Sequence, residues 1–252
     1  MKTAIFWPKS LLFVAILATG TLLNAQSRQM SSSLRLVSYD EPTMDTAAAI
    51  WLSASNLVLV DVENAANNPE LLRLMKLKNP KIILIAKINL TEIVLPTINR
   101  PIESRFIDEL GSLEKEFLLR DLAGQGVVAP REGGGYIFNI SADCPRASNG
   151  LKYNEFIANF FAQNVFSDPI WDGIYVRASW ENIYNSVVSS GHITEFDANK
   201  DKQGDEKFRF IVAWKKGFED FIDKVISTKG PTFIAFNRTK FVEEPRRSVA
   251  NY

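Results

Sequence analysis

Acidic side chains follow directly after apolar runs in this chain, at positions where they could exchange protons with a bound molecule. Asp40 follows the run that ends at Tyr39, and Asp61 and Glu63 follow a run of four apolar residues. Residues two apart in an extended strand lie on one face, which would point Asp61 and Glu63 the same way. Two carboxylates that face one space can act as general acid and general base. Asp61, Asp40 and Glu63 are therefore the candidate catalytic residues.

Each acid also has a structural alternative. Asp61 should be at least half buried after its apolar run, and buried acids are usually paired or functional. Asp40 lies just before Pro42 and could instead serve a turn or a helix N-cap. Glu63 could instead cap a helix or face solvent. Asp172 begins an apolar run rather than ending one, so we expect it to be structural.

The elements that position these acids follow from an alternation of short apolar runs with helical patterns. Six runs are predicted as strands: 34–39, 57–62, 81–90, 136–140, 172–176 and 232–237. Helices are predicted over 43–54, 69–78, 151–165 and 208–227, with a partly helical stretch at 106–122. Strands that alternate with helices in this way imply right-handed βαβ units and a parallel sheet.

Six such units fit either a barrel or an open doubly wound sheet. An open sheet would favour a glycine-rich phosphate turn after its first strand, but no glycine lies in residues 39–42. The glycines at 133–135 precede a predicted strand rather than a helix. We therefore predict an α/β fold of the (β/α) TIM-barrel type over residues 34–252. A full barrel has eight units, so this one would be truncated after about six, either as a fragment or as a shortened barrel.

The first 25 residues have the pattern of a secretory signal peptide. Lys2 and Lys9 supply positive charge, residues 11–23 are mostly apolar, and residues 24–26 offer a cleavage region. The apolar stretch is shorter than the roughly 20 residues of a membrane span. We predict a cleaved signal over 1–25, a flexible Ser-rich linker over 26–33, and a secreted or periplasmic protein without a stable membrane span. An uncleaved anchor is the alternative.

Composition excludes several classes of function. The chain has 29 basic and 29 acidic residues, and it lacks the basic excess of a nucleic-acid-binding protein. Cys144 is the single cysteine, so the fold of an exported chain must rest on its hydrophobic core rather than on an intrachain disulfide. His192 is the single histidine, which argues against multi-histidine metal sites and lowers the odds of Ser-His-Asp chemistry.

Residues 197–205 place oxygen ligands at positions 1, 3, 5 and 9, as calcium loops do. However, Lys202 stands where such loops have glycine, and Phe208 stands where they have an acid. We therefore expect a solvated acidic loop, and we predict neither a metal nor a cofactor.

Several short motifs together resemble a known family. They are Asn79-Pro80-Lys81, residues 117–124, Asn139-Ile140-Ser141, residues 171–175, residues 197–205 followed by 214–217, and Phe236-Asn237. Their order and spacing are similar to those of secreted TIM-barrel proteins classed as hypothetical glycosyl hydrolases of group fifteen, which are distantly similar to endo-α-1,4-polygalactosaminidases. The resemblance covers most of residues 37–237. It implies a polysaccharide substrate and hydrolysis of its O-glycosyl bonds by two carboxylates.

Arg177 is the main departure from that family, whose members typically carry an acid at this position. Arginine cannot give up a proton at working pH, so the family role does not carry over. Arg177 could bind a carboxylated or sulfated sugar through its planar guanidinium, or pair with an acid such as Asp61. Trp180 could stack on a sugar ring or pack in the core. The candidate substrate-binding residues are Arg177, Trp180, Glu181, Asn139, Asn237 and Tyr39.

Three hypotheses follow from the sequence. The first is an exported glycoside hydrolase in which Asp61, with Asp40 or Glu63, supplies the two carboxylates. The second is a degenerate barrel that binds glycan without cleaving it, which Arg177 and the missing units favour. The third is a truncated product without function.

Overall fold

A computed structural model describes residues 35–91, 99–129, 135–177, 183–184, 187–188, 195–230 and 234–237 of the chain. The predicted signal peptide and linker lie outside these residues, so they stay predictions. Within the described residues, none of the helices combines the length and the apolar character needed to cross a membrane.

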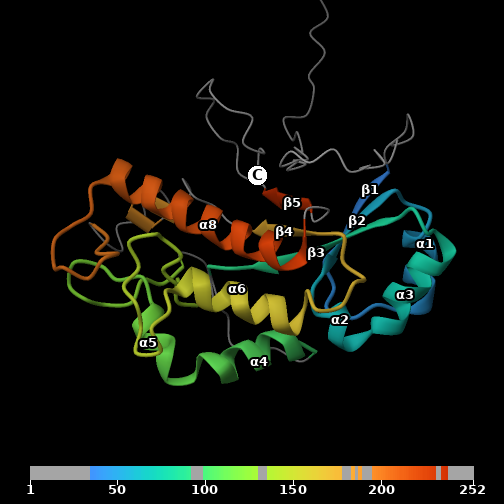
Figure 1. The fold of residues 1–252 in the computed structure, drawn as a ribbon, viewed down its shortest axis with the longest axis horizontal. Helices are drawn as coiled ribbons and strands as arrows, with labels where there is room; N and C mark the ends of the chain where they lie inside the picture. The colour runs from blue at the N-terminus through green and yellow to red at the C-terminus, as the bar shows by residue number, and fades with distance from the viewer. Residues whose placement is uncertain are drawn as a thin grey trace, which may run out of the picture.

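Five parallel strands form one sheet at the centre of the fold (Figure 1). They are β1 (Leu36–Tyr39), β2 (Leu57–Asp61), β3 (Ile83–Asn89), β4 (Gly173–Arg177) and β5 (Ile234–Asn237). Their order across the sheet is the same as their order along the chain. Each strand pairs in parallel with the next, as the alternation of strands and helices predicts.

The predicted TIM barrel is wrong, because the sheet of the described residues is open: β1 and β5 stand at its two edges and do not pair with each other. The alternating pattern predicts that the strands are parallel. It does not determine closure, which requires a set number of strands with a matching tilt and stagger.

The predicted strand at 136–140 is also wrong. This run makes isolated antiparallel bridges, Leu118 with Phe138 and Val128 with Tyr136, and does not join the sheet. Its apolar residues pack locally in the long crossover between β3 and β4, which a short apolar run cannot reveal by itself. The six predicted units therefore become five strands.

The described helices include the four main ones that the pattern predicts, with ends that differ by a few residues, and a short one at 64–67 that it does not predict. They are α1 (Thr46–Leu52), α2 (Asn64–Asn67), α3 (Pro69–Lys78), α4 (Pro101–Leu110), the 3₁₀ turn Gly111–Leu113, α5 (Glu114–Phe117), α6 (Tyr153–Asn164) and α8 (Lys207–Lys229). Local chemistry explains their starts. Asp45 caps α1 by accepting from the Ala48 amide at 2.7 Å, and proline opens both α3 and α4, where a missing amide hydrogen costs nothing.

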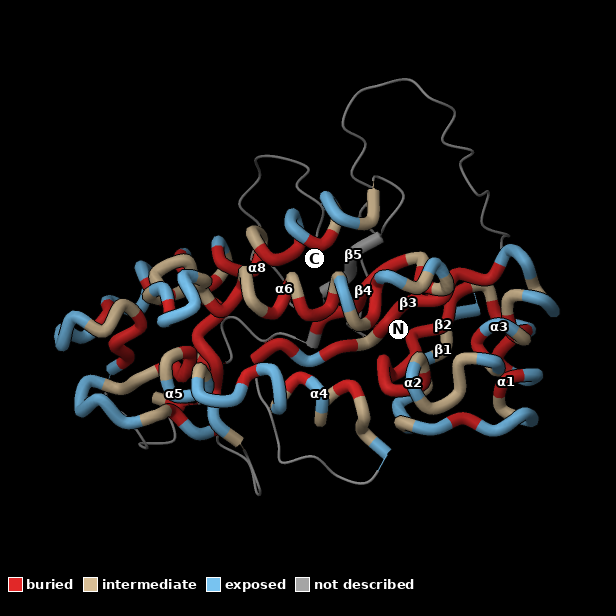
Figure 2. Tube along the Cα trace, turned by 60° about the horizontal axis from the view of Figure 1, so that its bottom comes forward, coloured by how far each residue is buried: buried red, intermediate tan, exposed pale blue. Residues whose placement is uncertain are grey.

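The two faces of the sheet differ in what packs against them. On one face Val58, Val60, Leu84 and Ala86 belong to a large core that also contains the buried side chains of the helices. On the other face lies a small separate cluster of Leu57, Leu59, Ile83, Ile85 and Tyr175. All of β2 is buried, as Figure 2 shows. This agrees with a parallel strand that is apolar on both faces.

Helices α6 and α8 run alongside each other (Figure 1) and pack together. Gly217 lets α8 approach the segment after residue 139, because a Cβ on Gly217 would stand 1.9 Å from the carbonyl oxygen of Ile140. The Ala142 amide donates to the Ala213 carbonyl oxygen at 2.8 Å in the same contact. Glycine is therefore required at position 217 for close approach of two backbones.

Asp172 has the structural role expected of an acid that begins a strand. Its Oδ2 accepts from the Leu84 amide at 2.8 Å and forms an ion pair with Lys76 of α3. The carboxylate therefore joins the start of β4 to β3 and to a helix.

Candidate functional site

Three charged side chains stand at one level on neighbouring strands. Asp61 lies directly opposite Lys87 in the register of β2 and β3. Tyr39 lies opposite Val60, so Asp40, the next residue, is level with Asp61. Lys87 Nζ forms an ion pair with Asp40 Oδ1, which shows that the side chains meet on the same face of the sheet. We refer to Asp40, Asp61 and Lys87 as the charged row.

The charged row lies at the carboxyl ends of the first two strands, which is where open α/β sheets place their ligand sites. One step earlier on the same face are Leu59 and Ile85, both buried in the small cluster. On this face of the sheet, apolar side chains therefore give way to charged ones between Leu59 and Asp61 on β2 and between Ile85 and Lys87 on β3. Tyr175 of β4 stands opposite Lys87 and continues the same level across the sheet.

Asp61 is the buried acid of the row. The residue is 8% exposed, Oδ1 accepts from the Glu63 amide at 3.0 Å, and Oδ2 lies 3.4 Å from Nη2 of Arg100. The expectation of a largely buried, paired acid is confirmed. The guanidinium of Arg100 offsets the cost of burying the carboxylate.

Asp40 is the accessible acid of the row. Its side chain is 66% exposed, whereas that of Lys87 is 10% exposed. Oδ1 of Asp40 accepts from the Ser38 hydroxyl at 2.7 Å as well as from Lys87. The two acids thus differ in environment: Asp40 faces solvent, and Asp61 lies against protein.

Glu63 caps a helix, which is the structural alternative that its sequence left open. The strand has already ended at Asp61, and Glu63 has helical backbone angles, so the expectation that the two side chains share a strand face is wrong. Its carboxylate oxygens accept from the amides of Ile102 and Glu103, at 2.8 and 2.9 Å, in the first turn of α4. Both oxygens are therefore engaged by backbone.

Burial governs the acidity of Glu63. The residue is 1% exposed, and this desolvation raises the pKa of Glu63 to about 7, against the opposing effect of its two backbone hydrogen bonds. The nearby Asp61 carboxylate raises this pKa further, and Arg100 lowers it. Glu63 thus titrates near neutrality while it caps α4 next to Asp61.

Two asparagines near Glu63 hold the segments around the row, and sequence reasoning missed them. The Asn64 side-chain amide donates to the carbonyl oxygens of Glu41 and Asp61, at 2.8 and 3.2 Å. The Asn67 amide donates to those of Pro42 and Asn99, at 2.8 and 2.7 Å. The Asn-rich composition of residues 64–68 was the available signal.

Lys87 was also missed. Its signal in the sequence is one lysine inside the apolar run 82–88. A charge in a buried strand needs a partner, which Asp40 supplies.

Tyr39 and Asn139 do not join the charged row. Tyr39 packs against the large core on the opposite face and donates its hydroxyl to the Thr43 carbonyl oxygen at 2.9 Å. Asn139 is fully buried, and its amide donates to the Ala198 carbonyl oxygen at 2.6 Å. Its Oδ1 accepts from both the amide and the hydroxyl of Ser141. These side-chain hydrogen bonds of Asn139 hold loops together.

The remaining predicted binding residues are described only in part. Arg177 ends β4 opposite Asn89, and Asn237 ends β5 opposite Val176, but their side chains lie outside what the structure describes. Trp180 and Glu181 lie outside the described residues altogether. Their roles in substrate binding stay predictions.

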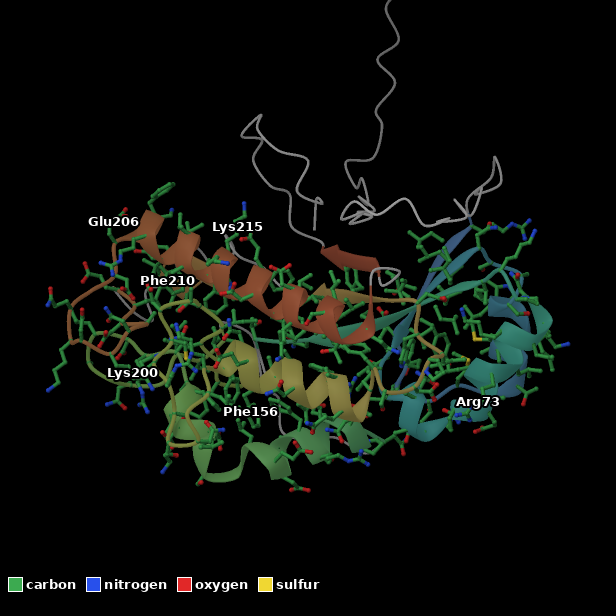
Figure 3. All side chains as sticks on the ribbon, in the orientation of Figure 1. Arg73, Phe156, Lys200, Glu206, Phe210 and Lys215 are labelled. Carbon is green, nitrogen blue, oxygen red and sulfur yellow. The ribbon has the colours of Figure 1, made fainter. Side chains whose placement is uncertain are left out.

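The acids of loop 197–205 serve its own backbone. The Asp197 carboxylate accepts from the amides of Asp201 and Lys202, at 3.0 and 3.1 Å, and Asp205 Oδ2 accepts from the Ala198 amide at 2.6 Å. Lys200 extends from the loop (Figure 3) and donates to the Glu116 carbonyl oxygen in α5. Among the described residues, no group of three or more His, Cys, Asp or Glu side chains is arranged to hold a metal ion.

No protein-family model matches the chain, and no curated protein matches it either. The resemblance to secreted glycoside hydrolases therefore stays a prediction from the motifs alone.

Proposed function

We propose that this protein hydrolyses glycosidic bonds of a polysaccharide, with Asp61 and Asp40 as its two carboxylates. The observation that supports this proposal is the charged row, which brings two acids to one level on neighbouring strands at their carboxyl ends. Glycoside hydrolysis ordinarily uses two carboxylates, one to protonate the leaving oxygen and one to act as base or nucleophile.

The different environments of the two acids suggest their roles. Asp40 is accessible, so it can reach the leaving oxygen of a bound sugar. Asp61 is buried and oriented by Arg100 and by the Glu63 amide, as befits a base or nucleophile that must keep one geometry. The signal-peptide pattern and the motif resemblance agree with an exported protein that acts on carbohydrate.

A second candidate function is glycan binding without turnover. The observation that favours it is that both acids already have cationic partners, Lys87 for Asp40 and Arg100 for Asp61. Arg177, at the end of β4, favours it as well, because this position carries a group that cannot transfer a proton.

The test is release of reducing ends from a panel of neutral and uronic-acid polysaccharides by wild type, Asp61→Asn and Asp40→Asn. The matched control is Asp108→Asn, an exposed acid of α4. Circular dichroism verifies folding of each variant. We expect turnover to vanish in Asp61→Asn, to fall at least tenfold in Asp40→Asn, and to be unchanged in Asp108→Asn.

Turnover that persists in a folded Asp61→Asn protein would rule out the hydrolytic assignment. Binding of one polysaccharide in affinity electrophoresis, with no turnover by wild type, would instead support the second candidate.

A further inference from the structure

The ion pair between Lys87 and Asp40 joins two strands that are not neighbours. β2 lies between β1 and β3 in the sheet, and adjacent strands are about 4.8 Å apart. The side chain of Lys87 must therefore extend across the end of β2 to reach Asp40. Asp61 occupies that level of β2 and forms its own ion pair with Arg100, while the ammonium group of Lys87 ends at Asp40.

The reach of Lys87 is fixed rather than mobile. Its side chain is 10% exposed, and Ile85, two residues earlier on the same face of β3, is buried in the small cluster. A lysine at the surface loses considerable rotamer entropy when it forms an ion pair, but this one is already confined by its surroundings. The cation therefore has a defined place in the row.

Two carboxylates at one level on adjacent strands repel each other, and like charges placed directly opposite are destabilising. The ammonium group of Lys87 offsets this repulsion, because it neutralises the charge of Asp40 that Asp61 would otherwise face. Arg100 contributes on the side of Asp61 only.

We propose that Lys87 is a positioning residue that sets the geometry of both acids, holding Asp40 directly and shielding Asp61 from it. The effect of Lys87 on catalysis rests on the proposed hydrolytic function. The electrostatic coupling of the Lys87 ammonium group to the two carboxylates does not depend on that function, and stability measurements can test it without any substrate.

The first experiment is a pair of double-mutant cycles read by thermal unfolding at pH 7. Lys87→Met is combined with Asp40→Asn in one cycle and with Asp61→Asn in the other. The matched control is Lys81→Met, an exposed lysine that precedes β3. We expect Lys87→Met to lower the Tm of wild type by several degrees and to have less than half that effect in either Asn background. Equal effects in all three backgrounds would overturn the inference.

The second experiment is the pH–rate profile of the polysaccharide hydrolysis that depends on Asp61. Among the side chains that the structure describes, the charged and titratable groups around Lys87 are Asp40 and Asp61 in the row, Tyr175 opposite Lys87, and Arg100 and Glu63 next to Asp61. We expect Lys87→Met to move the acidic limb of the profile to higher pH by about one unit, and Lys87→Arg to restore most of the wild-type position. A purely structural role would lower the rate at all pH values alike.

The two failures are distinguishable. If Asp61→Asn leaves hydrolysis unchanged, the proposed function is wrong. The double-mutant cycles then still test the electrostatic coupling of Lys87 to the two acids. Hydrolysis that requires Asp61 but has the wild-type pH profile in Lys87→Met defeats only the role of Lys87.

Discussion

Oε2 of Glu63 accepts a hydrogen bond of 2.8 Å from the amide of Ile102, which joins the turn after β2 to the start of α4. The second oxygen accepts from Glu103 at 2.9 Å. A buried acid thus provides the cap of a helix that has no side-chain cap of its own from Arg100. The cap matters to the candidate site because Arg100, the partner of Asp61, immediately precedes this helix.

Glu63 makes the stability of the protein depend on pH. Burial raises the pKa of Glu63 from 4.5 to about 7, so the folded state binds the proton more tightly than the unfolded chain does. Protonated Glu63 therefore contributes on the order of 3 kcal/mol to the free energy of unfolding. This contribution is complete below pH 4.5 and is lost as the pH rises to about 7. We expect Glu63→Gln to remove this part of the decline in the free energy of unfolding, measured in urea from pH 4.5 to 7.5.

Glu109→Gln, an exposed substitution in α4, is the control and should retain the wild-type slope. A Glu63→Gln protein with the same slope as wild type would contradict the assignment.

Asp172→Ala should destabilise the protein by about 2–3 kcal/mol. The change leaves the Leu84 amide without its acceptor and the partly buried Lys76 without its counterion. Chemical denaturation measures the effect. Asp220→Ala removes an exposed ion pair with Lys216 and should cost no more than about 0.5 kcal/mol. Similar costs for the two variants would mean that Asp172 does not join β3 to β4.

Gly217→Ala should destabilise the protein although it places alanine inside a helix, where alanine normally gains about 1 kcal/mol over glycine. The new Cβ would meet the backbone of Ile140 and Ser141. Relieving this clash requires α8 to move, at a cost of about 2 kcal/mol or more. The measurement is the midpoint of urea unfolding, with Lys216→Ala as a neighbouring control. A stabilised Gly217→Ala protein would show that the close approach is absent.

Asn139→Ala tests whether a predicted binding residue has a structural role. The three hydrogen bonds of its side chain connect residue 141 to loop 197–205, so their loss should cost about 2–4 kcal/mol. Limited proteolysis should cut the loop faster in the variant. If glycan affinity fell while stability and proteolysis were unchanged, the original prediction of a binding role would be correct instead.

Local patterns predicted the elements of this fold better than their assembly. The apolar runs at 57–62 and 81–90 became β2 and β3, because strands buried on both faces need continuous apolar residues. The run at 136–140 has a similar composition, yet it pairs with residues 118 and 128 in the long crossover. Only tertiary contacts distinguish these outcomes, and the same holds for the closure of a sheet.

The candidate site was predictable in part for a related reason. Asp61 and Asp40 could be placed because an acid after an apolar run marks the end of a strand. Glu63 could not, because the chain turns into helical conformation between residues 61 and 63 and the alternation of faces stops there. The pairing of Lys87 with an acid two strands away depends on strand order, which the sequence did not determine.

The order of the strands has a consequence for how the chain forms its sheet during synthesis. β1, β2 and β3 can pair as soon as they leave the ribosome, since each needs only its predecessor in sequence. β4 begins after a crossover of residues 90–172, and the entropy of closing so long a loop delays its arrival. Until then the free edge of β3 presents unpaired backbone groups on an apolar strand, which is a template for association with other chains. Nascent protein should thus be most prone to aggregation before residue 173 is made.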